Sequence, residues 1–196
     1  QAVLQKGKYG NSLYFNGRPE AADSEFRGIE GARPRTIAFW VRVQPGAKKS
    51  QSYAMVAWGA LAPSQKWQLG WNPNPANGTV GAIRTEFYNG YVIGSTDLRD
   101  GRWHHVVSLF TGGKNANVAT HVRHYVDGKL EGVSGFEAHS IKTRTSGKGA
   151  KAVSLGKYIN DNKWYFKGHL DEFFIFDHAL TPQEIYLLRD NKYLPK

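Results

Sequence analysis

The sequence contains no cysteine, which excludes disulfide bonds, thiolate metal sites and thiol nucleophiles. No stretch approaches the roughly 20 consecutive apolar residues that span a bilayer. The start shows no charged segment followed by an apolar one, so we expect that a signal peptide is absent or was removed before Gln1. Without disulfide bonds or thiolate metal sites, the fold must be stabilised by the packing of its side chains.

The composition is that of a folded globular protein. Hydrophobic residues make up 40% of the 196 positions and aromatic residues 13%, enough to form a buried core. Sandwiches and barrels of this length are commonly single units. We therefore expect one monomeric domain over residues 1–196, as a fragment of a larger protein.

Basic residues outnumber acidic ones by 26 to 16, a formal net charge of +10. The excess is concentrated in residues 141–170, with seven Lys or Arg against one acid, and in residues 33–49, with five unopposed. Such an excess favours an anionic partner, although charge runs often serve only solubility. We find no specific nucleic-acid-binding motif. Residues 141–151, rich in Lys, Thr, Ser and Gly, are expected to form a mobile loop.

Short segments rich in β-branched and aromatic residues alternate with Gly, Asn and Pro, which is typical of a sandwich or barrel. The pattern predicts strands at residues 12–15, 35–43, 53–59, 66–71, 80–87, 91–95, 104–110, 121–126, 129–133, 152–155 and 169–176. Asn-Gly and Asp-Gly pairs supply turn residues that tolerate positive φ. The clearest hairpin is Val126-Asp127-Gly128-Lys129.

One helix is predicted near the end of the chain. Thr181 is its N-cap, Pro182 its first residue and Glu184 its N3 residue, which together form a capping box. The helix should end before Pro195. We expect it to dock on the sandwich through its apolar residues, Ile185, Leu187 and Leu188.

Five strings, in order along the chain, resemble motifs of the laminin-G-like domains of the concanavalin A-like lectin/glucanase superfamily, bacterial type. They are GKYGNSLYFNG (7–17), TIAFWV (36–41), DGRWHHVV (100–107), YVDGKL (125–130) and FKGHLDEF with ALTPQEI (166–185). The resemblance agrees with the all-β prediction. It implies a two-sheet antiparallel jelly-roll sandwich with one short C-terminal helix.

The resemblance also implies where the protein is located and what it binds. Members mostly bind glycans or proteins outside the cytoplasm, so we expect a secreted, periplasmic or cell-surface protein. Many relatives hold a structural calcium at positions that match Asn16 and Asp171 here. Calcium takes six to eight oxygen ligands and an amide is a weaker ligand than a carboxylate, so Asn16 is a departure. Asp171 could instead cap a turn.

Strand alternation predicts a polar face beside the core. On residues 80–87, Arg84 and Glu86 point away from the apolar face, and Gln68 and Asn72 do so on the preceding strand. An arginine beside a carboxylate suits sugar hydroxyls, a carboxylate or a sulfate. A cross-strand ion pair is the alternative interpretation.

Several aromatic residues lie at strand ends, where they could stack on sugar rings. We select Trp58 and Tyr91, and also Trp164, which lies near Lys167 and could form an aromatic–basic cluster with it. The cluster is compatible with an anionic glycan and equally with a loop anchored by its rings.

The sequence favours binding over catalysis. It has no closely spaced carboxylate pair like that of concanavalin-like glycosidases. Residues 84–86 and 165–168 resemble two motifs of jelly-roll alginate lyases, whose central Gln–His motif is missing. We expect a non-catalytic module for an acidic or sulfated polysaccharide. The alternatives are a protein-interaction module of a larger cell-envelope protein and, more remotely, a polysaccharide lyase.

Overall fold

The structure, a computed structural model, describes residues 2–48, 53–159 and 164–190. Lys49 and Lys163 of the basic segments, and Pro195 as the predicted limit of the helix, lie outside the described residues. The elements are β1 (Val3–Lys6), β2 (Asn11–Asn16), β3 (Ala22–Asp23), β4 (Arg35–Arg42), β5 (Ala54–Ala60), β6 (Lys66–Trp71), β7 (Ile83–Phe87), β8 (Gly90–Ile93), β9 (Trp103–Phe110), α1 (Val118–His121), β10 (Val122–Val126), β11 (Lys129–Leu130), β12 (Gly135–Glu137), β13 (Ala150–Leu155), β14 (Lys167–Phe176) and α2 (Pro182–Arg189).

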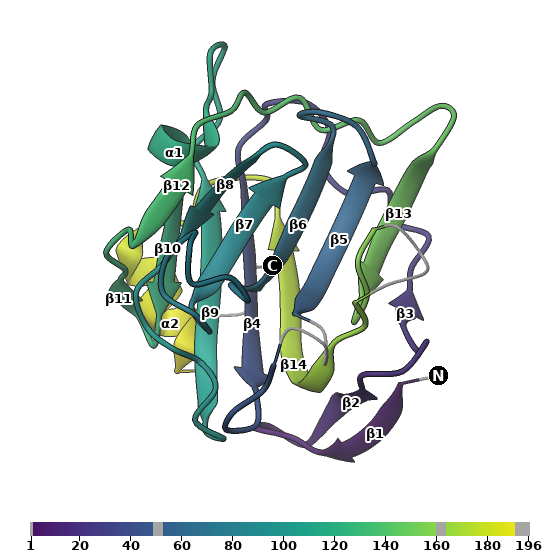
Figure 1. Cartoon of the computed structure of the whole chain (residues 1–196), viewed down its shortest axis with the longest axis vertical. Helices are drawn as coiled ribbons and strands as arrows, with labels where there is room; N and C mark the ends of the chain where they lie inside the picture. The colour runs from purple at the N-terminus through teal and green to yellow at the C-terminus, as the bar shows by residue number, and fades with distance from the viewer. Residues whose placement is uncertain (1, 49–52, 160–163, 191–196) are drawn as a thin grey trace.

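Two antiparallel sheets of seven strands each lie face to face (Figure 1). The first sheet has the order β1-β2-β14-β4-β9-β10-β11, and the second has the order β12-β8-β7-β6-β5-β13-β3. Strands far apart in sequence are neighbours in both sheets, so the chain passes repeatedly from one sheet to the other. This is the jelly-roll sandwich that the sequence predicts.

The core lies between the sheets and follows from strand alternation. Trp67, Leu69 and Trp71 of β6 point inward and are completely buried, as their spacing predicts. Trp58 of β5 stacks on Trp67 with ring centroids 5.7 Å apart. These large rings bury much of the apolar surface that stabilises the sandwich.

The predicted hairpin turn and capping box are both present. Val126 pairs with Lys129, and both residues between them have positive φ, as their Asp-Gly sequence predicts. Thr181 Oγ1 accepts a hydrogen bond from the backbone N–H of Glu184, and the Glu184 carboxylate accepts one from the N–H of Thr181. Helix α2 therefore begins where the sequence predicts.

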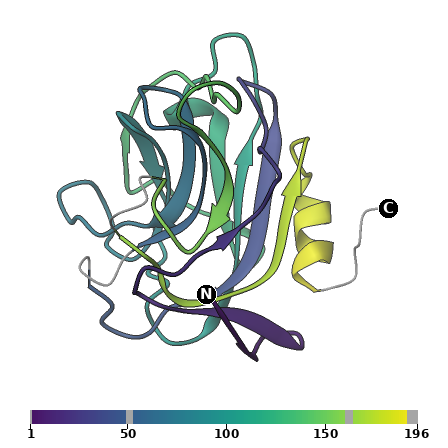
Figure 2. The same cartoon turned by 90° about the vertical axis from the view of Figure 1, so that its right-hand side faces the viewer.

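Helix α2 covers part of the outer face of the first sheet (Figure 2). Its buried residues, Ile185 and Leu188, pack in one cluster with the outward side chains of that sheet, Ala38, Val107, Leu109 and Phe176. This packing leaves the outer face of the second sheet on the opposite side of the molecule. Neither α1 nor α2, the helices of the described ranges, is long and apolar enough to span a membrane.

Some elements differ from the sequence prediction. Strands β1, β3 and β12 are not predicted, because β1 is exposed at all four positions and the other two have only two and three residues. The predicted strand 80–87 starts only at Ile83, because Ala82 N donates to Thr79 O in a turn. The four-residue helix α1 is also unpredicted, although Asn117 caps it through its side chain.

Residues 141–151, predicted as a mobile loop, show regular alternation in their first half. Ile141, Thr143 and Thr145 are 2%, 1% and 8% exposed, whereas the residues between them face outward. Backbone N–H groups of Lys142 and Arg144 donate to the carbonyls of residues 64 and 65. The segment is thus bonded along one end of the sandwich, which its polar composition does not reveal.

Asp171 on β14 closes the turn that joins β1 to β2. Its Oδ2 accepts hydrogen bonds from the backbone N–H groups of Lys8 (2.7 Å) and Tyr9 (3.0 Å), and its Oδ1 accepts from that of Glu172. The close approach requires Gly7, because a Cβ atom there would lie 2.4 Å from Asp171 Oδ2. Two parts of the first sheet 160 residues apart are joined in this way.

We predict that Gly7→Ala lowers the free energy of unfolding by about 2 kcal/mol, because the added methyl group displaces the Asp171 carboxylate from its N–H partners. Urea denaturation followed by tryptophan fluorescence measures the loss. Gly132→Ala is the control, since an added Cβ there meets no atom closer than 3.8 Å. Equal stability of the two variants would contradict the capping role of Asp171.

The buried histidines fall into two classes. Burial lowers the pKa of His124 to about 3 and that of His105 to about 4. His124 Nε2 lies 2.8 Å from Thr85 Oγ1, which links the two sheets. His104 differs, because its hydrogen bond to Asp127 raises its pKa more than burial lowers it.

We predict that the protein loses stability as pH falls from about 6.5 to about 4. In this window the unfolded chain binds protons that folded His105 and His124 do not bind, so acid favours unfolding. His124→Gln should flatten this dependence in urea denaturation at several pH values. His104→Gln should have the opposite pH dependence. It should lower the free energy of unfolding mainly below pH 6.5, and by little once the pH exceeds the raised pKa of His104. If the free energy of unfolding of His124→Gln falls with pH as steeply as that of the wild type, this assignment is contradicted.

Candidate functional site

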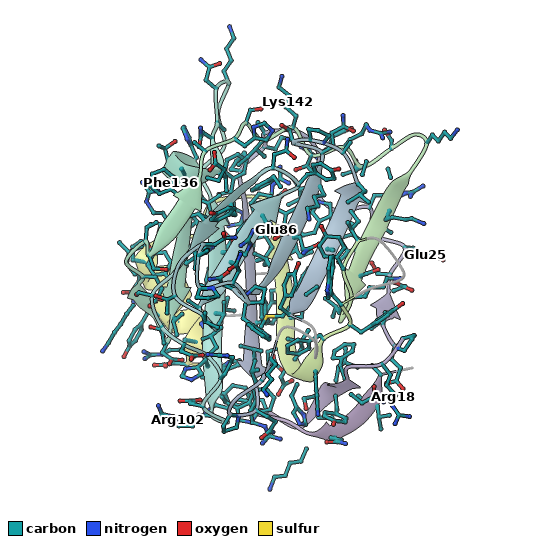
Figure 3. All side chains as sticks on the ribbon, viewed as in Figure 1. Arg18, Glu25, Glu86, Arg102, Phe136 and Lys142 are labelled. Carbon is teal, nitrogen blue, oxygen red and sulfur yellow. The ribbon has the colours of Figure 1, made fainter. Side chains whose placement is uncertain are left out.

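Seven residues, one from each strand, form a row across the outward face of the second sheet. The strand registers place them opposite one another, in the order Glu137, Tyr91, Glu86, Gln68, Ala57, Ser154 and Asp23. Residues directly opposite in antiparallel strands share a face, and this row alternates with the inward-facing Thr85 and Phe87. Figure 3 shows Glu86 near the centre of this sheet.

The Glu86 carboxylate is the centre of a hydrogen-bonded cluster. Lys66 Nζ lies 2.5 Å from its Oε1, Gln68 Nε2 donates to the same oxygen at 3.0 Å, and Arg84 Nε donates to Oε2 at 2.9 Å. Lys66 and Gln68 are completely buried and Glu86 is 8% exposed. A buried carboxylate needs this degree of pairing, because its desolvation is costly.

The charge state of Glu86 follows from these contacts. Burial acts to raise the pKa of its carboxyl group, but the charges and hydrogen bonds of Lys66 and Arg84 outweigh burial and hold the pKa below its ordinary value. Glu86 is therefore ionised at neutral pH. A general acid requires a raised pKa, so this environment does not prepare Glu86 for that role.

Arg84 extends the cluster along the same face. Its guanidinium lies over the ring of Tyr91, with Cζ 4.1 Å from the centroid, and Nη1 donates to Asn72 Oδ1 at 3.3 Å. The amide of Asn72 is fixed by donating to the carbonyls of residues 74, 78 and 79. Within the described ranges, Arg84 Nη2 has no hydrogen-bond partner. It can therefore donate to a hydroxyl, carboxylate or sulfate.

An aromatic group lies beside this cluster. Tyr53, Tyr158 and Trp164 contact one another with ring centroids 5.1 to 6.4 Å apart. Lys66 joins the group to Glu86, because its Nζ donates to the Tyr158 hydroxyl at 2.8 Å. Trp164 is 38% exposed and offers ring surface to a ligand.

A hollow of about 260 Å³ interrupts the row at Ala57. Its other lining residues are Asp23, Ser24, Lys151, Ala152, Ser154, Lys157 and Ile159. Asp23 pairs with Lys157 at 2.9 Å and accepts a hydrogen bond from Ser154 Oγ. Ala57 itself is only 1% exposed, so the hollow is formed mainly by the longer side chains around it.

The structure brings together five of the eight predicted binding residues, namely Gln68, Asn72, Arg84, Glu86 and Tyr91. Trp164 is their neighbour through Tyr158. Trp58 requires a correction, because it is completely buried in the core, where its Nε1 donates to Ile29 O. Lys167 lies on β14 of the first sheet, opposite Asn16 of β2.

The two predicted calcium ligands lie apart. Asn16 pairs with Lys167, and Asp171 is four residues further along β14, a distance of about 13 Å along the strand. Asn16 is engaged with Arg18 and Glu20, and Asp171 caps the β1–β2 turn. Calcium–oxygen distances are about 2.3–2.6 Å, so these two side chains do not fit one calcium ion. Across the described ranges, no three His, Asp or Glu side chains gather as a metal-binding group.

The two strings that resemble lyase motifs lie on different elements. Arg84 and Glu86 are paired on the outward face of β7 in the second sheet. Residues 165–168 instead lead into β14 of the first sheet, and Tyr165 bridges Ala54 at the end of β5.

Sequence reasoning missed Lys66, Tyr53 and Tyr158. Lys66 was detectable, because it is two residues before Gln68 on the same strand and shares its face. Tyr53 is the first residue of the predicted strand 53–59 and precedes β5, whereas Tyr158 follows β13 and lies outside any predicted strand. Only the tertiary contacts bring these two tyrosines to the cluster.

We predict that Glu86→Gln lowers the free energy of unfolding by about 3–5 kcal/mol, because the buried Lys66 loses its counter-charge. The double variant Lys66→Met/Glu86→Gln should recover a large part of this loss, since a thioether side chain needs no counter-charge. Urea denaturation of both single variants and the double variant gives the coupling energy. Additive losses would mean that the pair is not coupled.

The sequence matches a family model over residues 22–186, which is most of the chain. The model, a laminin-G type, is described as Concanavalin A-like lectin/glucanases superfamily. No curated protein sequence matches the chain significantly. The match covers every strand from β3 to β14.

Solved structures share the fold at low sequence identity. Domain 4 of AbnA, a GH43 extracellular arabinanase from Geobacillus stearothermophilus in complex with arabinotriose, is 21% identical with a TM-score of 0.64, over 96% of this chain and 81% of that one. The Ruminococcus gnavus IT-sialidase CBM40 is 11% identical with a TM-score of 0.62, over 96% and 100%. The botulinum neurotoxin serotype G binding domain is 13% identical with a TM-score of 0.57, over 98% and 45%.

Proposed function

The chain belongs to the laminin-G-like family of the concanavalin A-like lectin/glucanases superfamily, and from this premise we propose that it is a non-catalytic carbohydrate-binding module. The row through Glu86 is its binding face. The observation that carries the proposal is the buried, fully paired Glu86 cluster, which presents Arg84 and Tyr91 together in a fixed geometry. Preorganised polar groups beside aromatic rings are what sugar recognition requires.

The chemistry of this face matches a sugar ring. Arg84 Nη2 can donate to a hydroxyl or an anionic oxygen, and the rings of Tyr91 and Trp164 can pack on C–H faces. Three of the structural neighbours are named with sugar ligands, namely arabinotriose, sialyllactose and gangliosides. Those ligands belong to those proteins, and they support a sugar as the ligand class here.

We favour an acidic or sulfated polysaccharide as the ligand. Along the row and around the hollow at Ala57 lie Lys66, Arg84, Lys151 and Lys157, against the acids Asp23, Glu86 and Glu137, an excess of one positive charge. The basic excess of this face attracts anionic groups. Such a module would act outside the cytoplasm, where these polymers occur.

A polysaccharide array read at rising salt concentration tests the proposal directly. We expect binding to one or more anionic glycans at low salt and weaker binding at higher salt, because salt screens exposed charges. Binding to none of the glycans would refute the carbohydrate role. Binding that is indifferent to salt would refute the anionic preference alone.

We predict that Tyr91→Ala weakens binding of the best array glycan by about tenfold, because it removes the ring that supports Arg84. Isothermal titration calorimetry measures the change. Tyr88→Ala is the matched control, since Tyr88 is 55% exposed in the same hairpin but outside the row. Similar losses in both variants would place the ligand elsewhere.

A protein partner is the second candidate function. Leu130, Val133 and Phe136 are 54–59% exposed on and between the edge strands β11 and β12. Exposed apolar residues at sheet edges are typical of protein contacts. Pull-down with this chain as bait, compared with its Phe136→Ser variant, separates this function from glycan binding.

A further inference from the structure

Both basic segments of the sequence contribute to one end of the sandwich. Residues 140–150, which we call the basic strap, cross this end between β12 and β13 (Figure 1). Lys142 on the strap lies at the top of the view in Figure 3. Gly31 N donates to Thr143 O at 2.6 Å, which joins the strap to the chain just before β4.

The basic strap is held so that its charges face outward. Ile141 and Thr143 are buried, and Lys142 between them is exposed. Arg144 is used within the protein, since its Nε donates to Gln65 Oε1 at 2.6 Å and its terminal nitrogens donate to strap carbonyls. Arg144 thereby fixes the strap, and Lys142 is left on its surface.

A hollow of about 350 Å³ lies beside the strap. We call it the end hollow, and its lining residues are Gly31, Ala32, Lys114, Asn115, Ala116, Asn117, Ser140, Ile141 and Lys142. Lys114 and Lys142 are its charged residues, and the others are small, apolar or neutral hydrogen-bonding groups. A lining with two cations and no carboxylate attracts an anion.

A third positive charge lies beneath the end hollow. Arg35 is completely buried on the rings of Trp67 and Phe110, and its Nη2 donates to the carbonyl of Gly31, a lining residue. Its other acceptors are the carbonyls of residues 29 and 33 and the hydroxyl of Thr143, all neutral. No carboxylate pairs with Arg35 anywhere in the described part of the chain. Buried charges are ordinarily paired, so this end of the protein has an unbalanced positive charge.

The charge of Arg35 persists at neutral pH. Burial lowers its pKa to about 9, which still leaves the guanidinium protonated below that value. The field of Arg35 therefore adds to those of Lys114 and Lys142, at a place where the protein interior screens it less than water does.

We propose that the end hollow and the basic strap form a second binding site, which takes the sulfate or carboxylate groups of an anionic polysaccharide. The ligand's charges would balance Lys114, Lys142 and Arg35, and its hydroxyls would meet the neutral lining groups. The lining contains no aromatic ring on which a nucleic-acid base could stack, which favours a polysaccharide over single-stranded nucleic acid. The site goes beyond the proposed function, because it does not use the Glu86 face.

Heparin, as a sulfated polysaccharide, is the probe, and uncharged dextran is the reference. We expect wild-type protein to bind heparin and not dextran, and Lys114→Gln/Lys142→Gln to bind heparin about five- to tenfold more weakly, with a smaller salt dependence. Lys6→Gln/Lys129→Gln is the control, since it removes the same charge from exposed positions elsewhere. Its affinity should stay within about twofold of wild type.

Several outcomes would overturn the second site. Equal losses in the two double variants would show attraction by net charge alone. Tighter binding of a DNA duplex or of phosphatidylserine vesicles than of heparin, at equal charge, would assign another partner. Backbone amide shifts in NMR give an independent readout, because heparin should perturb residues 113–117 and 140–145. Shifts confined to the row through Glu86 would refute the end hollow while leaving the proposed function intact.

Discussion

The proposed binding face depends on the ion pairing of one carboxylate in a site from which water is almost excluded. Glu86 takes hydrogen bonds from Lys66, Gln68 and Arg84, and two of these donors are completely buried. Because buried donors need an acceptor, the geometry of all four side chains is mutually determined. Arg84 is in turn held on Tyr91, so the surface is formed before any ligand arrives.

Two other buried charged side chains, Asp171 and Arg35, also require hydrogen-bond partners. Asp171 is saturated by N–H groups of the β1–β2 turn and of its own strand, which joins distant parts of the first sheet. Arg35 finds only neutral oxygens and aromatic faces, so its charge is stabilised without being neutralised. One sandwich thus presents two different polar surfaces, a paired one at Glu86 and a basic one at the end hollow.

Alternation along single strands predicted a large part of the fold and of the candidate face. It placed Trp67 and Leu69 on the core face of the second sheet, and Gln68 and Arg84 on the opposite face, because successive side chains of a strand point to opposite faces. Position at a strand end wrongly suggested that Trp58 is exposed, because the segment around Ile29 covers it. Polar composition wrongly suggested a mobile loop at residues 141–151, where Ile141, Thr143 and Thr145 are buried and Thr143 Oγ1 accepts a hydrogen bond from Arg35.

Local sequence patterns predicted the all-β class, the family, the capped terminal helix and the residues available for an outward polar face. These are local properties, which the sequence shows as strand alternation with a period of two, as Asn-Gly and Asp-Gly turn pairs and as motifs in a fixed order. Only the tertiary structure decided which of those residues meet. The row from Glu137 to Asp23 joins seven strands whose order in the sheet differs from their order in the chain. Strand register and sheet order depend on long-range pairing, so no local period could show that Tyr53 and Tyr158 join the cluster around Glu86, or that Lys114 and Lys142 line one hollow.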